Sequence, residues 1–115
     1  MTTTKFNMVR DINGYNGFGL PDSNTKFSAT LVASTDESFT VPSDAENYLV
    51  LFSIEPGSRV WVCPGATAAV PGGGTFATTT SELNPVARKY AAGTIVHCIT
   101  PDDTADVGVC IYALQ

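Results

Sequence analysis

Residues 48–64 read YLVLFSIEPGSRVWVCP, and this segment indicates the fold class of the whole chain. Over residues 48–54, large apolar side chains occupy both odd and even positions, the pattern of a strand buried on both faces. Residues 55–58 (EPGS) are typical of a turn, because proline presets φ at the first corner and glycine accepts the positive φ of a type II turn. Apolar residues return over 59–63, so we predict a β-hairpin with a four-residue connection.

Similar short apolar patterns recur along the chain at a spacing of roughly ten residues. Residues 82–92 favour a further strand because Pro85 precedes a β-branched and aromatic run, with a helix as the alternative. About seven or eight short strands predict an all-β fold, an antiparallel two-sheet sandwich (jelly-roll-like) or a barrel. The remaining expected strands cover residues 27–33, 38–41, 94–100 and 105–114.

Residues 1–26 show no sustained hydrophobic period, and Gly14, Gly17 and Gly19 oppose a regular helix or strand there. The segment is nevertheless too apolar for a solvated tail. We therefore expect an extended N-terminal arm over residues 1–26, laid against its own body or a neighbour, ahead of a single β-sandwich domain over residues 27–115. The arm residues expected to make these contacts are Phe6, Ile12, Tyr15, Phe18 and Leu20.

Composition limits the partners of the chain. A length of 115 residues suits one domain. Charged residues make up only 15%, against about 25% in typical soluble domains. The net charge of −5 argues against nucleic acid and against an anionic membrane, because both require clustered lysine and arginine. The first residues lack a signal-peptide core and no apolar run is long enough for a membrane span, so we expect synthesis in a cytoplasm.

The three cysteines, Cys63, Cys98 and Cys110, all lie within apolar strand patterns. We expect three reduced, buried thiols that act as small hydrophobic side chains in a reducing compartment. One disulfide with a remaining free thiol is the alternative.

Few residues are arranged for chemistry. His97 is the only histidine, and Cys98 points to the opposite face of the same strand, so we expect a hydrogen-bonded structural histidine rather than a zinc ligand or a catalytic base. Asp102, Asp103 and Asp106 lie in one turn, where they either bind a cation or keep the turn soluble; the absence of an EF-hand pattern favours the second. We expect no cofactor and no enzymatic activity.

Residues 65–80 (GATAAVPGGGTFATTT) form a long glycine- and threonine-rich segment. Long loops inside compact domains are commonly functional or mobile. Trp61, Val70 and Phe76 are therefore candidates for contact with a ligand or partner, although a single strand tryptophan is more often a core or interface residue.

Three segments resemble small structural proteins encoded in the morphogenesis modules of tailed bacteriophages. They are VWVCPGATAAVPGGGTF (60–76), SELNP (81–85) and TPDDTADVGVCIYAL (100–114). The resemblance covers residues 27–115, and DINGYNGFGLP (11–21) is similar as well.

This resemblance implies a capsid decoration (auxiliary head) protein, a non-enzymatic virion subunit assembled in the host cytoplasm. Its implied partners are the major capsid protein or another virion protein, and its implied state is a homo-oligomer, with a trimer expected. The apolar arm residues would then contact the capsid or a neighbouring subunit. The alternative is a carbohydrate- or receptor-binding module of a phage fibre or tail that uses residues 65–80 and Trp61.

Overall fold

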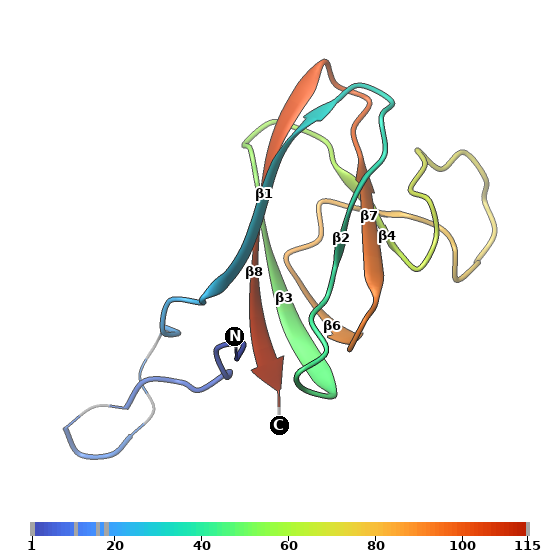
Figure 1. The fold of residues 1–115 in the computed structure, drawn as a ribbon. Helices are drawn as coiled ribbons and strands as arrows, with labels where there is room; N and C mark the ends of the chain where they lie inside the picture. The colour runs from blue at the N-terminus through green and yellow to red at the C-terminus, as the bar shows by residue number, and fades with distance from the viewer. Residues whose placement is uncertain (1, 11, 16, 18, 115) are drawn as a thin grey trace.

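The computed structural model describes residues 2–10, 12–15, 17 and 19–114. Within these ranges the chain contains strands and no helix (Figure 1). Residues 82–92 form two short strands, so the helix alternative for this segment is wrong. The eight strands are β1 (Thr25–Val32), β2 (Glu37–Thr40), β3 (Asn47–Ile54), β4 (Trp61–Pro64), β5 (Glu82–Leu83), β6 (Ala87–Ala91), β7 (Ile95–Ile99) and β8 (Thr104–Leu114).

The strands form two four-stranded antiparallel sheets, β1-β8-β3-β6 (sheet A) and β2-β7-β4-β5 (sheet C). The chain changes sheet at each of the first three connections, and this strand order is that of a jelly roll. Neither sheet closes on itself. The predicted antiparallel two-sheet sandwich is confirmed, and the barrel alternative is wrong.

The core lies between the sheets and follows the predicted alternation along the strands. In β3, Tyr48, Val50 and Phe52 are buried, while the intervening residues are half-buried or exposed on the outer face, so the prediction that this strand is buried on both faces is wrong. In β8 the odd-numbered residues 105–113 are buried. They face sheet C, which contributes Val62 and Val96.

The turn predicted at residues 55–58 is present, but the predicted hairpin is wrong. The backbone N–H of Ser58 donates to the carbonyl of Glu55 (3.1 Å), and Gly57 has a φ of 83°. However, β3 pairs with β8 and β6, whereas β4 pairs with β7 and β5 in the other sheet. The turn therefore carries the chain from one sheet to the other.

The backbone N–H and C=O groups just after this turn form hydrogen bonds with side chains rather than with β3. The Arg59 N–H donates to a carboxylate oxygen of Asp102 (2.8 Å), and the Val60 N–H donates to the side-chain oxygen of Asn84 (2.7 Å). The Asn84 amide also donates to the Ser58 carbonyl (3.0 Å). These side chains stand where a hairpin partner would have been, and they fix the crossing between the sheets.

We expect Asn84→Ala to lower the free energy of unfolding by about 2 kcal/mol, because it leaves the Val60 N–H without its acceptor and places alanine in a left-handed conformation. The φ of Asn84 is 46° in the structure. Asn84→Gly loses the same hydrogen bonds but accepts this φ, so its loss is expected to be smaller. Urea unfolding of both variants measures the difference; equal stability of Asn84→Ala and the unmodified chain would contradict this account.

Candidate functional site

The first described residues of the chain extend sheet A. Lys5 forms an isolated parallel β-bridge with Ala113, near the end of β8. The Phe6 N–H donates to the Ala113 carbonyl (2.8 Å), and the Ala113 N–H donates to the Thr4 carbonyl (2.8 Å). Because β1 reaches only as far as Ile111 along β8, residues 4–6 occupy the edge of β8 that β1 leaves open.

Thr3 is buried and fixed to the core through Asp44. The Thr3 N–H and hydroxyl donate to the two Asp44 carboxylate oxygens at 2.6 and 2.9 Å. The hydroxyl of the fully buried Tyr48 donates to the same carboxylate (2.6 Å). These hydrogen bonds, that from Tyr48 first, lower the pKa of Asp44 to about 2 because they favour its charged form.

The chain returns to the same end of β8 before β1 begins. The Tyr112 hydroxyl donates to the carbonyl of Pro21 (2.6 Å), and the Ser23 hydroxyl donates to the carbonyl of Ile111 (2.6 Å). The Ser23 side chain is buried at this point. Residues 21–25 are therefore hydrogen-bonded to β8, as residues 4–6 are.

Asn24 joins these two segments. Its side-chain oxygen accepts from the Thr4 N–H (3.0 Å), and its amide donates to the Thr2 carbonyl (2.6 Å). The described residues between 7 and 20 thus leave and re-enter the body at neighbouring points and project from it (Figure 1), and we call them the N-terminal loop.

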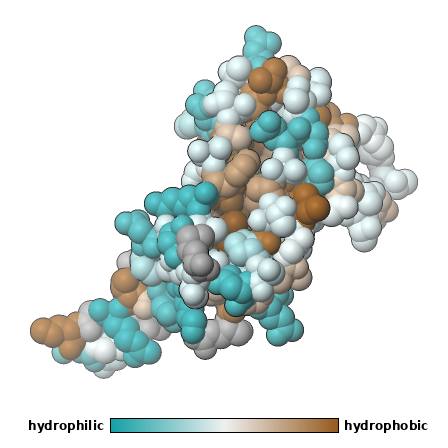
Figure 2. All heavy atoms as spheres, viewed as in Figure 1, coloured by the Kyte–Doolittle hydropathy of each residue, from teal (hydrophilic) through white to brown (hydrophobic). Residues whose placement is uncertain are grey.

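The N-terminal loop exposes apolar side chains. Ile12 is 99% exposed and Tyr15 is 72% exposed, and Figure 2 shows hydrophobic atoms at the far end of this projection. Phe6 and Leu20 lie half-buried at its base. Phe18 is outside the described residues. Of the predicted contact residues that the structure describes, Ile12 and Tyr15 thus have the largest exposed fractions.

The other long connection, residues 65–80 (the long loop), is fixed at its start over the outer face of sheet C. The N–H of the buried Ala68 donates to one carboxylate oxygen of Asp36 (3.1 Å). The second carboxylate oxygen of Asp36 lies 2.8 Å from Nδ1 of His97. The prediction that His97 is hydrogen-bonded is confirmed. Its partner at position 36 lies far from it in sequence, and no spacing pointed to this pair.

Beyond this anchor the long loop projects on the other side of the sandwich from the N-terminal loop (Figure 1). Val70 is 52% exposed, and Phe76 is fully exposed. Trp61 is half-buried on the outer face of sheet C, and its Nε1 is buried with no partner among the described residues. The structure therefore does not bring Trp61 and Phe76 to the same exposed surface as Ile12.

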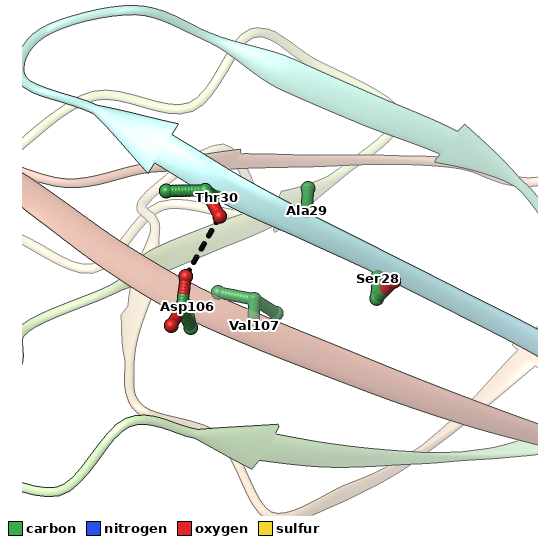
Figure 3. A pocket seen from close by; sticks show the side chains of 5 residues that line it. All are labelled: Ser28, Ala29, Thr30, Asp106 and Val107. Atoms are coloured by element: carbon green, nitrogen blue, oxygen red, sulfur yellow. Dashed lines mark hydrogen bonds between the residues drawn. The ribbon is translucent and has the colours of Figure 1, made fainter.

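The acidic turn is engaged by the protein itself. Asp102 forms an ion pair with Arg59 (Nη2 to Oδ1, 2.7 Å), and Asp106 accepts a hydrogen bond from the Thr30 hydroxyl (2.7 Å; Figure 3). In the part of the chain that the structure describes, no three histidine, cysteine or acidic residues are grouped closely enough to hold a metal ion. No helix in that part is long and apolar enough to cross a membrane.

All three cysteines are free, so the disulfide alternative is wrong. Cys63 and Cys98 are buried as predicted, and burial raises the pKa of Cys98 to about 12. Cys110 is only half-buried, which corrects the expectation that every thiol is buried. The reason is the strand alternation: even-numbered residues of β8 face away from the core.

No family model matches the chain, and no curated protein or solved structure matches it either.

We expect the anchor of the N-terminal loop to loosen in acid. The folded-state pKa of Asp44, about 2, lies below the ordinary value of 3.8, so its contribution to stability is complete above about pH 5 and is lost as the pH falls through 3.8 toward 2. Hydrogen exchange at the Thr3 amide should accelerate over this range beyond the intrinsic pH effect. Asp44→Asn should abolish that excess; an unchanged pH profile in this variant would contradict the role of Asp44.

The thiols should differ in reactivity. In the folded protein at pH 8, Cys110 is expected to react with a thiol reagent at least about tenfold faster than Cys98, whose burial and raised pKa disfavour the thiolate. Cys110→Ala should remove the fast phase, while Cys98→Ala should retain it. A fast phase that survives in Cys110→Ala would show that the exposure of Cys110 is not what sets the rate.

Proposed function

We propose that this chain is a non-enzymatic virion subunit that decorates and stabilises a bacteriophage capsid through protein–protein contacts, with the N-terminal loop as its attachment element. The observation that carries the proposal is the almost complete exposure of Ile12 at the end of a loop whose two ends are both tied to β8. Exposed apolar side chains on a defined projection are typical of interaction sites. The resemblance of residues 27–115 to phage structural proteins supports a virion partner.

The anchors make the N-terminal loop suited to binding. Full burial of a side chain such as isoleucine is worth about 1.5–3 kcal/mol. A free tail would lose much of this gain in conformational entropy when it becomes ordered. Because residues 4–6 and 21–25 are already hydrogen-bonded to the body, less entropy remains to be lost on docking.

The proposed partner is the major capsid protein or another virion protein, and the proposed location is the virion, after assembly in the host cytoplasm. The low charged content of 15% is consistent with a surface that contacts other proteins. The proposed state is a homo-oligomer; the trimer expected above is the alternative to the two-fold pairing proposed below.

The alternative, a carbohydrate- or receptor-binding module, relies on Trp61 and the long loop. Aromatic recognition of a sugar needs an open ring face. Trp61 is half-buried, with its Nε1 enclosed, and this leaves Phe76 as the exposed aromatic residue of the long loop. The geometry therefore favours attachment through the N-terminal loop.

The test compares two double variants of the full chain. Ile12→Ser with Tyr15→Ser alters the N-terminal loop, and Val70→Ser with Phe76→Ser alters two exposed apolar residues of the long loop. We expect the first pair to raise the dissociation constant for capsids assembled without this chain by at least about a hundredfold, because two buried apolar side chains are lost. The second pair should bind as the unmodified chain does. Co-sedimentation with capsids measures both.

Thermal unfolding of both double variants serves as the control for folding. Capsid binding that survives the change at Ile12 and Tyr15 but fails with the change at Val70 and Phe76 would move the attachment site to the long loop. Binding of the unmodified chain to glycans or cells, without binding to capsids, would overturn the proposal in favour of the fibre or tail module.

A further inference from the structure

The two sheets have four edge strands, and three of them carry features that discourage pairing with another chain. β5 has only two residues, and β2 has four and ends just before Val41 and Pro42. β6 follows Pro85 and carries Arg88 and Lys89. β1, in contrast, has eight residues without proline and a single charge, Lys26. It is the longest and least protected of these edges.

Most backbone groups on the outer edge of β1 have no partner among the described residues; the carbonyl of Val32, at the end of the strand, accepts from the Thr35 N–H (3.1 Å). In its antiparallel register with β8, odd-numbered residues such as Ala29 exchange hydrogen bonds with β8, and the Ala33 N–H continues this ladder to the Asp103 carbonyl (3.2 Å). The N–H and C=O groups of Lys26, Ser28 and Thr30 consequently point to the opposite side. Among the described residues, no backbone group forms a hydrogen bond with these outward-pointing groups.

We propose that β1 pairs antiparallel with β1 of a second copy of this chain, around a two-fold axis at Ser28. In this register Ser28 faces its own counterpart, and Lys26 faces Thr30 of the second copy. Each facing pair can exchange two backbone hydrogen bonds, about six in all. The two copies of sheet A would then form one continuous sheet. This inference is independent of capsid attachment, which involves the N-terminal loop.

Charge complementarity favours a second copy of this chain as the partner of β1, and it favours the register centred at Ser28. Lys26 and Asp106 both lie on the outer face of sheet A, toward opposite ends of β1, and Asp106 is hydrogen-bonded to Thr30. Antiparallel pairing at Ser28 brings each Lys26 opposite Thr30 of the other copy, about two strand spacings (roughly 10 Å) from its Asp106. The flexible four-carbon stem of lysine can span this distance.

The outer face provides room for that lysine. A shallow cavity of about 400 Å³ lies over the paired strands β1 and β8 and is lined by Ser28, Ala29, Thr30, Asp106 and Val107. In Figure 3 the carboxylate of Asp106 and the hydroxyl of Thr30 meet at one end of this cavity. The ammonium group of Lys26 from the second copy could approach the Asp106 carboxylate there. Among the described residues, the hydrogen-bond partner of that carboxylate is the neutral Thr30 hydroxyl rather than a cation.

On the inner face the same pairing covers an open side of the core. Phe27 is only half-buried, although its ring lies 5.1 Å from that of Phe39 across the sandwich. In the proposed register Phe27 faces Ala29 of the second copy, a cross-strand neighbour that removes apolar surface from water without crowding the ring.

The first test uses Ser28→Pro. Its N–H points to solvent in the monomer, where proline on an edge strand is tolerated, but proline removes a donor at the centre of the proposed pair. We expect the dimer dissociation constant, measured by sedimentation equilibrium of the full chain, to rise at least about tenfold. Ser28→Ala retains the N–H and should dimerise normally. A dimer that is unaffected by Ser28→Pro would overturn the proposal.

The second test reverses charges. Each single variant, Lys26→Asp or Asp106→Lys, places like charges at both contacts between position 26 of one copy and position 106 of the other. Each variant should therefore be monomeric at concentrations where the unmodified chain is dimeric. An equimolar mixture of the two variants has opposite charges in both contacts and should form a heterodimer. Failure of the mixture to associate, when each variant is folded by circular dichroism, would overturn the assigned register.

Hydrogen exchange provides a readout at single residues. The amides of Phe27, Ala29 and Leu31 should be protected at all protein concentrations, because they bond to β8. Those of Lys26, Ser28 and Thr30 should gain protection only as the dimer forms. A chain that stays monomeric at every concentration, or a trimer in which these three amides remain unprotected, would overturn the inference.

Discussion

The structure depends on the pairing of β8 along both of its edges. Its even-numbered residues bond to β3, as the Glu55 N–H shows by donating to the Asp106 carbonyl (2.9 Å). Its odd-numbered residues bond first to β1 and then, at Ala113, to residues 4–6. Eleven residues near the C-terminus thus organise sheet A, hold both ends of the N-terminal loop and place Cys110 and Asp106 on the outer face. A break in this strand would release all of these features together.

The strands could be predicted because their signal is local. Alternation of apolar side chains, with glycine and proline between the runs, located every long strand to within a few residues, and it anticipated the inward faces of β3 and β8. The partner of a strand is a non-local property, which explains the hairpin error. A turn that joins two strands looks the same in sequence whether the strands pair or face each other across a core. The hydrogen bonds that occupy the backbone after the turn come from the side chains of Asn84 and Asp102. The spacing of these two residues from the turn follows no pattern that the sequence would reveal.

The candidate site was predictable only in part, for the same reason. Glycines and scattered apolar residues indicated that residues 1–26 form neither a regular helix nor a long strand. They did not indicate that the segment divides into two anchored ends and a projecting loop. That division depends on side chains distant in sequence: Asp44 for Thr3, and Tyr112 for Pro21. An aspartate or tyrosine with such a partner is indistinguishable in sequence from one facing solvent.

The N-terminal loop and the free edge of β1 are neighbours in sequence but act in different directions. The loop leaves the sandwich at the Thr25 end of β1 (Figure 1), whereas the proposed pairing is centred at Ser28. Two-fold antiparallel pairing would place the loops of the two copies at opposite ends of the joined strands. If both proposals hold, each dimer presents two separate attachment elements. The second attachment then becomes intramolecular, so contacts of modest strength at Ile12 and Tyr15 would suffice for stable binding to a repetitive shell.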